Sequence, residues 1–562
     1  MKRILIILIA VLLVMVMVPI GSGCKATTAE TTAAATTAAA ETTVAATTAA
    51  ETTAAEEEIP GKVELESYKV LLEENPKYGG IFKYGLTMEP DQLDNHLANL
   101  QSTFFCGDPM NGFLWRWLPD MSGYISELAT NVVWQNEEKT VILIELRDDV
   151  TFHNGEKLTA EDVKASLDRA ISDESIHKTN LSEVDRIEIV DDYSIKVFFK
   201  KFGAGFLDYI PKIAIYPKSI IENDVESLKT NPIGCGPFEF VEWQRGYKIV
   251  LKKFDNYFRE DLPYLDGMEI IFFADSATLT YAIENGEIDM VTDVGIDQIT
   301  VIPKDNPNIE PYFDPIMGMA WIGINMADPL FKDNKDLRYA IRYAIDPRVF
   351  AANMSVKEND PVLTFAQADP RLANPKWEWD ESWYDIEKAK QFLEDAGYPN
   401  GEGLPAIDII VPDTPFEDYM GDLAQAQLAE IGINLNVFVL PVPEYITRAI
   451  AGEYGLNCCG DTHDVDPGVK ITQYFTPGGA IEWGSFYTYN QELIDKIGEQ
   501  AIETNREKRL QLIRECWDIS LEEMPIIWLH KRPNNELRWN YVENYIGIPN
   551  TIFYLIYIHL DK

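Results

Sequence analysis

The sequence predicts a mixed α/β protein built from several domains. Helix and strand signals alternate along the chain, and several predicted helices end at a glycine that is followed by a β-rich run. The chain beyond residue 62 is about 500 residues long, which is too large for a single hydrophobic core.

The first residues have the order of a secretory signal. Lys2 and Arg3 precede an uncharged apolar run from Ile4 to Ile20, and small residues then lead to Cys24. The same run is just long enough to be an uncleaved membrane anchor. With either interpretation, the rest of the chain is expected to be exported.

The end of this segment, Ser22-Gly23-Cys24, resembles a bacterial lipobox. The resemblance implies that 1–23 is a signal peptide and that Cys24 carries a lipid, although Gly21 stands where an aliphatic residue is usual. Residues 24–62 are rich in Thr, Ala and Glu and cannot bury enough apolar surface to offset the entropy of ordering. We expect a disordered tether with a reach of about 30–35 Å.

Two segments predict the first regular elements after the tether. In 158–171, Thr159 is a candidate N-cap with Asp162 three residues later, and apolar residues then recur at helical spacing. In 236–254, two β-rich runs flank a turn near Gly246, which predicts a pair of strands.

Two helices are predicted in the middle of the chain. The segment 334–347 has apolar residues on one helical face and stops at Pro347. The segment 384–398 predicts a helix that Asp385 opens and Gly397 closes.

Two helix–strand pairs and two apolar strands are predicted in the second half of the sequence. The segment 423–440 predicts a helix that ends at Gly432 and a strand after it, and 506–529 predicts a helix followed by a strand. The apolar runs in 317–325 and 524–531 are both typical of strands.

Composition and missing motifs exclude several classes of function. The chain has 48 basic and 91 acidic residues, a net charge of −43, and such a surface repels nucleic acid and anionic lipid. There is no Gly-x-x-x-x-Gly-Lys phosphate loop, Gly-x-Ser-x-Gly elbow, His-Glu-x-x-His pair or Cys-x-x-Cys pair. The six cysteines show no disulfide framework: Cys24, Cys106, Cys235, Cys458, Cys459 and Cys516.

Five stretches, in order along the chain, point to one family. They are "ELATNVVWQNEEKTVILIELRDDVTFHNGEKLTAEDVKASLDRA" (127–170), "NPIGCGPFEFVEWQRGYKIVLKKFDNYF" (231–258), "ENGEIDMV" (284–291), "INMADPLFKDNKDLRYAIRYAID" (324–346) and "YDIEKAKQFLEDAGYPNGEG" (384–403). On these residues the chain resembles the bacterial extracellular solute-binding proteins of peptide-type ABC importers, solute-binding family 5. The resemblance extends over about 78–540.

The resemblance implies a periplasmic-binding-protein-like clamshell of type II. Two α/β lobes would enclose the ligand, with an extra α/β domain inserted in the first lobe. Lobe I would comprise 78–98, 230–322 and 526–562, the extra domain 99–229, and lobe II 323–525. The two crossings, near 323 and 526, would form the hinge.

The function that the resemblance implies is binding, not catalysis. The protein would capture a di- or oligopeptide between its lobes and deliver it to a membrane permease powered by separate ATPase subunits. Closure would exclude water and strengthen polar contacts to the ligand. Neither a cofactor nor a nucleic-acid partner is expected. The lipid on Cys24 would hold the protein at the membrane, facing the periplasm or the cell exterior.

Other functions stay open at this point. Some members of the family bind oligosaccharides, nickel complexes or other solutes, and the 12 tryptophans and 26 tyrosines would suit sugar stacking, although aromatic residues also build cores. A secreted hydrolase would need a convergent catalytic set that the sequence does not show. An adhesin would use the same signal and tether without the five ordered stretches.

The stretch "NCCGDTHDVDPG" (457–468) is a candidate site of a different kind. Two cysteines, a histidine and three aspartates could suggest a metal centre. However, Cys458 and Cys459 are adjacent and would point apart on a strand, and no second Cys/His cluster completes a tetrahedral set. We therefore expect no metal.

The resemblance implies a ligand-binding role for the same stretch. In peptide-binding members a Gly-Asp in a similarly placed loop carries the aspartate that pairs with the α-ammonium of the peptide, and here that pair is Gly460-Asp461. Asp464 follows in the loop, and Trp483 and Asn325 complete the predicted ligand-binding set. A plain turn-capping role for Asp461 is the alternative. Many relatives have an aromatic residue before the Gly-Asp, where this chain has cysteine.

Overall fold

The computed structural model describes residues 61–97, 101–203, 205–292, 294, 296–352, 370–372, 374, 377, 380–414, 417–462, 466–548 and 552–562. The expected signal peptide, Cys24 and nearly all of the tether lie outside these residues, as does Asp464. Within the described ranges, no helix is long and apolar enough to cross a membrane.

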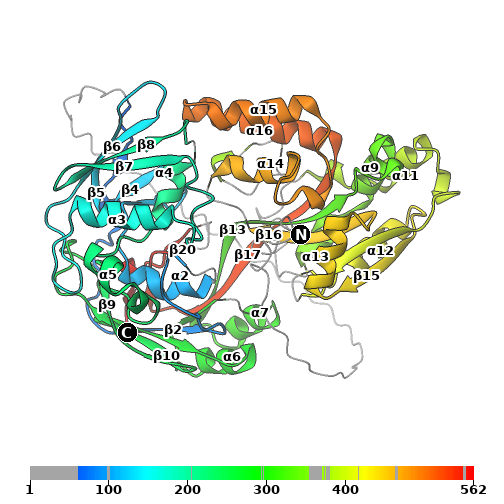
Figure 1. The fold of residues 1–562 in the computed structure, drawn as a ribbon. Coiled ribbons are helices and arrows are strands. Elements are labelled where there is room, and N and C mark those ends of the chain that lie inside the picture. Colours follow the sequence, from blue (N-terminus) through cyan, green and yellow to red (C-terminus); the bar gives the residue numbers. More distant parts are fainter. Residues whose placement is uncertain are drawn as a thin grey trace, which may run out of the picture.

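A ten-stranded mixed sheet runs through the molecule (Figure 1). Its strand order is β15-β14-β16-β13-β17-β12-β2-β11-β10-β9. These strands are β2 (Ile81–Leu86), β9 (Phe238–Gln244), β10 (Lys248–Lys253), β11 (Gly267–Phe272), β12 (Met290–Val291), β13 (Ile309–Ile324), β14 (Ile407–Pro412), β15 (Leu435–Leu440), β16 (Leu456–Thr462) and β17 (Ile526–Trp539). We refer to the β9 side of the sheet as the first half and to the β15 side as the second half.

Two long antiparallel strands, β13 and β17, join the halves. They pair from Ile309 opposite Trp539 to Gly323 opposite Ile526, with register shifts between Pro315 and Met319 and just beyond. On one side β13 pairs with β16, and on the other β17 pairs with β12. The pair is therefore the structural link between the two halves.

The packing shows where this strand pair changes from one core to the other. Met319 on β13 and Leu529 on β17 pack in the core of the second half, whereas Ile309 and Leu537 pack in a cluster of the first half. The change of core falls between these residues on each strand. Gly323 and Ile526, where the sequence placed the crossings, are therefore further into the second half.

A third part of the chain lies between β2 and β9. It contains a four-stranded antiparallel sheet of order β5-β6-β8-β7, and its hydrophobic cluster also takes in residues from 254–264 and 548–557. Its elements are α2 (Gln101–Gly107), β3 (Trp115–Trp117), β4 (Tyr124–Ser126), β5 (Ala129–Trp134), β6 (Val141–Leu146), α3 (Ala160–Ala170), β7 (Val184–Asp191), β8 (Ser194–Phe199), α4 (Phe206–Tyr209) and α5 (Lys218–Asn223). We call it the inserted part.

The predicted helix starts and stops are confirmed. The Asp162 carboxylate accepts a hydrogen bond from the backbone N–H of Thr159 at the start of α3, and Asp385 caps the helix predicted in 384–398. Gly397 and Gly432 follow their helices with φ of 93° and 91°. The helices outside the inserted part are α6 (Ser276–Glu284), α7 (Ile296–Asp305), α8 (Pro329–Lys332), α9 (Lys335–Ala344), α10 (Pro347–Ala352), α11 (Ile386–Asp395), α12 (Met420–Ala429), α13 (Val442–Ala451), α14 (Pro467–Phe475), α15 (Gln491–Ile502) and α16 (Arg506–Glu523).

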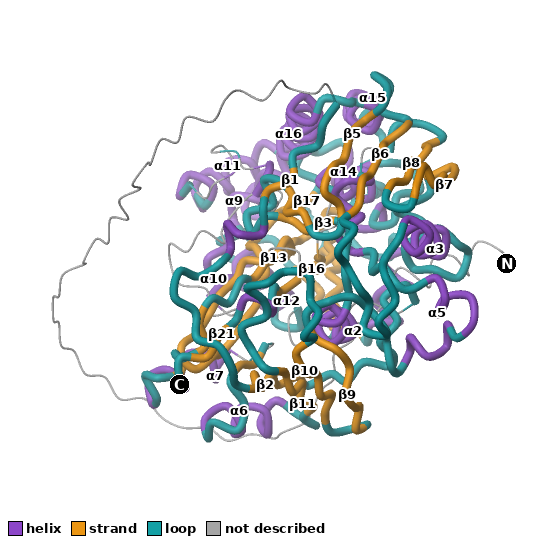
Figure 2. Tube along the Cα trace, turned by 90° about the vertical axis from the view of Figure 1, so that its left-hand side faces the viewer, coloured by secondary structure: helices purple, strands orange, loops and turns teal. Residues whose placement is uncertain are grey.

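The helices α14, α15 and α16 of the second half lie beside the sheet of the inserted part (Figures 1 and 2). Lys139, between β5 and β6, donates a hydrogen bond to the carbonyl of Thr504, between α15 and α16. The inserted part and the second half are therefore in contact at a place distant in sequence from the strands that connect the halves.

Candidate ligand-binding site between the two halves

The predicted Gly-Asp pair lies at the end of β16, where the two halves meet. Gly460 is opposite Ala320 and Asp461 is opposite Met319, at the register shift of β13. The side chain of Asp461 is outside what the structure describes, and so is the whole of Asp464. The main chain of the predicted amine acceptor thus lies beside the stretch of β13 that leaves the second half.

The two adjacent cysteines lie within the same strand, as predicted. Cys458 is fully buried and Cys459 is partly buried. Burial, with Cys459 next to it, raises the pKa of the Cys458 thiol, so this side chain behaves as a small apolar group and not as a thiolate ligand. Among the described residues, no group of three or more His, Cys, Asp or Glu side chains could hold a metal ion.

Trp483 lies close to this strand. Its ring centroid is 6.3 Å from that of Trp321, the residue opposite Cys459, and 6.2 Å from that of Tyr445. Its indole N–H donates to the carbonyl of Ala480 at 3.0 Å. The half-buried ring therefore packs within the second half, near the predicted Gly-Asp pair.

Asn325 lies at the opposite end of β16. Its backbone N–H donates to Gly455, which is six residues before Asp461, or roughly 20 Å along a strand. Its side-chain amide donates to the carbonyls of Gly452 (3.1 Å) and Tyr454 (2.8 Å). The structure thus brings Trp483 to the predicted pair but keeps Asn325 away from it, with both amide hydrogens used inside the second half.

Charged residues that the sequence did not single out connect the inserted part to the second half. The Arg371 guanidinium donates to Asp208 Oδ1 at 2.9 Å, and the two side chains are 3% and 10% exposed. The Tyr124 hydroxyl donates to the same carboxylate oxygen at 2.6 Å. Since Asp208 and Arg371 are separated by 163 residues, no local pattern reveals this pair.

A second ion pair lies next to the first. Asp466 caps the start of α14 and accepts from Arg509 at 2.7 Å and 3.0 Å. A Cβ atom at Gly205, in the inserted part, would lie 2.4 Å from the Asp466 carboxylate. Glycine is therefore what allows the backbone of the inserted part to approach the capped end of α14 this closely.

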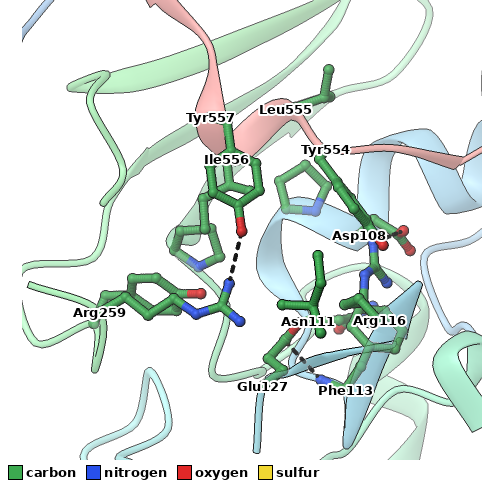
Figure 3. Close-up of a pocket in the computed structure, with 14 residues that line it drawn as sticks. Asp108, Asn111, Phe113, Arg116, Glu127, Arg259, Tyr554, Leu555, Ile556 and Tyr557 are labelled. Atoms are coloured by element: carbon green, nitrogen blue, oxygen red, sulfur yellow. Dashed lines mark hydrogen bonds and ion pairs between the residues drawn. The ribbon is translucent and has the colours of Figure 1, made fainter. Parts of the chain in front are cut away.

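A small cavity with charged residues in its lining lies elsewhere, between the inserted part and the C-terminal segment (Figure 3). Its volume of about 40 Å³ has room for about three water molecules and is far below the size of a ligand pocket. It is lined by two arginines, two carboxylates and aromatic residues, among them Arg116, Arg259, Asp108, Glu127, Tyr257 and Tyr557.

Charged side chains around this cavity have partners within the protein. Arg116 pairs with Asp108 at 2.9 Å, and Glu127 accepts from the backbone N–H of Phe113 at 3.0 Å. Burial raises the pKa of both carboxyl groups, and nearby arginines oppose the rise. Its size and its balanced charges fit an internal hydration site, so this cavity is not a candidate for the solute site.

Comparison with known proteins identifies the family. The family model for "Bacterial extracellular solute-binding proteins, family 5 Middle" matches residues 123–481, more than half of the chain. The glutathione-binding protein GsiB of Salmonella paratyphi A is 26% identical over 406 residues, which are 68% of this chain and 76% of that protein.

Solved structures share the fold. The oligopeptide-binding protein AppA from Bacillus subtilis, in complex with a nonapeptide, has a TM-score of 0.66 at 21% identity, covering 87% of this chain and 100% of that one. NikZ from Campylobacter jejuni, in complex with Ni(L-His), has a TM-score of 0.65 at 20% identity, covering 82% and 94%. The chain therefore has the mixed α/β clamshell fold and belongs to the family 5 bacterial extracellular solute-binding proteins, which are non-enzymatic receptors of ABC importers.

Proposed function

We propose that this receptor captures peptides and delivers them to the permease and ATPase subunits of a peptide importer. The proposal rests on the position of the main chain of Asp461, at the end of β16 and beside the stretch of β13 that links the halves. A group at that position can contact a ligand held between two lobes. The names of GsiB and AppA, a glutathione-binding and an oligopeptide-binding protein, support a peptide-like solute.

In this proposal the Asp461 carboxylate accepts a hydrogen bond from the α-ammonium group of the peptide, and Gly460 and Asp464 belong to the same binding site. Trp483 provides an aromatic wall next to the same strand. A hydrogen bond to a charged group contributes roughly 1.5–3 kcal/mol. Loss of the carboxylate should therefore weaken binding about tenfold to a hundredfold.

We further propose a division into lobe I, an extra domain and lobe II, with the boundaries that the sequence predicts near 323 and 526 moved along the two strands. The hinge in this proposal lies on β13 between Ile309 and Met319 and on β17 between Leu529 and Leu537, because the strands change cores there. A lipid on Cys24 would hold the body near the permease.

The test is a binding titration of the purified protein with trialanine, N-acetyl-trialanine, glutathione and the nickel–histidine complex. Wild type should bind trialanine and bind the N-acetylated form at least tenfold more weakly. Asp461→Ala should lose most of the trialanine affinity. The matched control is Asp395→Ala, at the exposed end of α11, which should bind as wild type does.

Two results would change the proposal. Equal trialanine affinity of wild type and Asp461→Ala would remove the amine-acceptor role. Binding of the nickel complex, with no binding of any peptide, would identify a different solute for the same receptor.

A further inference from the structure

The contact between the inserted part and the second half is built around a buried ion pair. Asp208 lies in α4, which packs in the core of the inserted part through Phe206 and Tyr209. Arg371 is anchored in the second half, because Leu372 next to it is fully buried in that core. The pair therefore connects two bodies that have separate cores.

Further contacts surround the pair. Arg506, at the start of α16, donates to the carbonyl of Ser122 at 2.9 Å. Gly205 touches the carboxylate of Asp466, which Arg509 holds. Polar contacts at a rim with a desolvated pair inside are typical of an interface that excludes water.

The interface lies apart from the strands that link the halves. Figure 1 shows α14 and α16 beside the inserted part, on one side of the β13–β17 pair. A rotation about these strands would separate α4 from α14 and expose Asp208 and Arg371 to water. The ion pair is made in the arrangement that the structure shows, and such a rotation would break it.

We propose that Asp208 and Arg371 form a clasp that holds the clamshell closed, and that the inserted part acts through it as a closing jaw. The clasp goes beyond the proposed function, because it sets the balance between open and closed forms whatever the solute is. It presupposes that the lobes move, but it does not depend on the solute being a peptide.

The chemistry of a buried pair makes the clasp sensitive to single changes. If Arg371 is lost, Asp208 stays desolvated in the closed form, but it regains water when the halves separate. The loss of Arg371 therefore raises the free energy of the closed form and does not affect the folding of either body. A change of charge at one partner should shift the closed-to-open ratio about 100-fold or more toward open.

The test measures the distance between spin labels on the two bodies, without any solute. The labels are placed on Lys201→Cys in the inserted part and Glu387→Cys in α11, whose side chains are 67% and 84% exposed. Protein without these substitutions, treated in the same way, corrects for labelling of the native cysteines. Wild type should give a short, narrow distance distribution, and Arg371→Glu a longer, broader one.

The charge swap provides the decisive comparison. Asp208→Arg combined with Arg371→Glu should return the short distance, because the attraction is restored with its direction reversed. The matched control is Arg186→Glu, which removes an exposed arginine–aspartate pair of the same inserted part and should leave the distance unchanged. A wild-type distance in Arg371→Glu, or a swap that stays as open as Arg371→Glu, would overturn the clasp. If Arg371→Glu does not fold, Asp208→Asn takes its place, and a wild-type distance in that variant would overturn the clasp equally.

Discussion

Two buried histidines should make the inserted part sensitive to acid. His96 and His177 are 0% and 1% exposed, and their ring centroids are 5.8 Å apart. His177 Nε2 donates to the carbonyl of Asn95 at 3.0 Å, and its Nδ1 accepts from the Tyr209 hydroxyl at 3.0 Å. His96 Nε2 donates to the carbonyl of Ala214 at 2.9 Å. The carbonyl partners favour a protonated ring and raise the pKa, so burial and not hydrogen bonding keeps each ring neutral.

Burial lowers the pKa of both groups from 6.5 to about 3, with Arg169 adding to the effect at His96 and His96 adding to it at His177. Because the folded pKa lies below the unfolded one, the unfolded chain binds more protons below pH 6.5. Stability is therefore complete above pH 6.5 and is lost as the pH falls toward 3. Each histidine gives a slope of up to about 1.4 kcal/mol per pH unit, so the two together cost about 4 kcal/mol between pH 7 and pH 5.

The assay is urea unfolding of wild type and His177→Gln, followed by tryptophan fluorescence, at pH 5, 6, 7 and 8. Glutamine can keep a donor toward Asn95 but cannot take up a proton. The variant should be less stable than wild type at pH 8 and should lose about 2 kcal/mol less between pH 7 and pH 5. The control is Lys164→Gln, on the exposed side of α3, whose pH profile should follow wild type. If the profile of His177→Gln runs parallel to that of wild type, His177 is not the source of the acid sensitivity.

Three further outcomes are expected. Gly323→Ala should lower the urea midpoint and reduce the free energy of unfolding by about 1–3 kcal/mol, because the added Cβ would lie 1.9 Å from the carbonyl oxygen of Gly484. An unchanged midpoint would show that the backbone at Gly484 can move away without loss of stability. Cys24→Ala should release the protein from the membrane fraction, and retention at the wild-type level would show that the apolar run 4–20 is the anchor. A saturating ligand should reduce the radius of gyration measured by small-angle scattering in Arg371→Glu, in which the clasp is broken; an unchanged radius in wild type alone would show that its free form is already closed, and an unchanged radius in both would speak against a clamshell.

Several features of the candidate site could be predicted from the sequence and several could not. The stretch around Cys458 and Cys459 was predicted to be a strand with small apolar side chains, and β16 confirms this. The proximity of Trp483 to that strand and the distance of Asn325 from it follow from packing between segments far apart in the chain. The role of Asp461 stays a prediction.

Local patterns are enough to predict the helix ends, and ordered stretches along the chain are enough to identify the family. Helix ends depend on residues within a few positions, such as Thr159 with Asp162 or the glycine after a helix, so short patterns are enough to predict them. The five ordered stretches were enough to identify solute-binding family 5, whose model also matches 123–481.

Two features follow only from the tertiary structure: where β13 and β17 pass from one hydrophobic core to the other, and which side chains hold the halves together. β13 is one continuous strand from Ile309 to Ile324, and its local pattern does not reveal that Ile309 packs in one core and Met319 in the other. Asp208 and Arg371 are 163 residues apart, and each is an ordinary charged residue in its own segment. The physical reason is that hydrophobic and electrostatic contacts depend on distance in space, whereas sequence patterns record only neighbours along the chain.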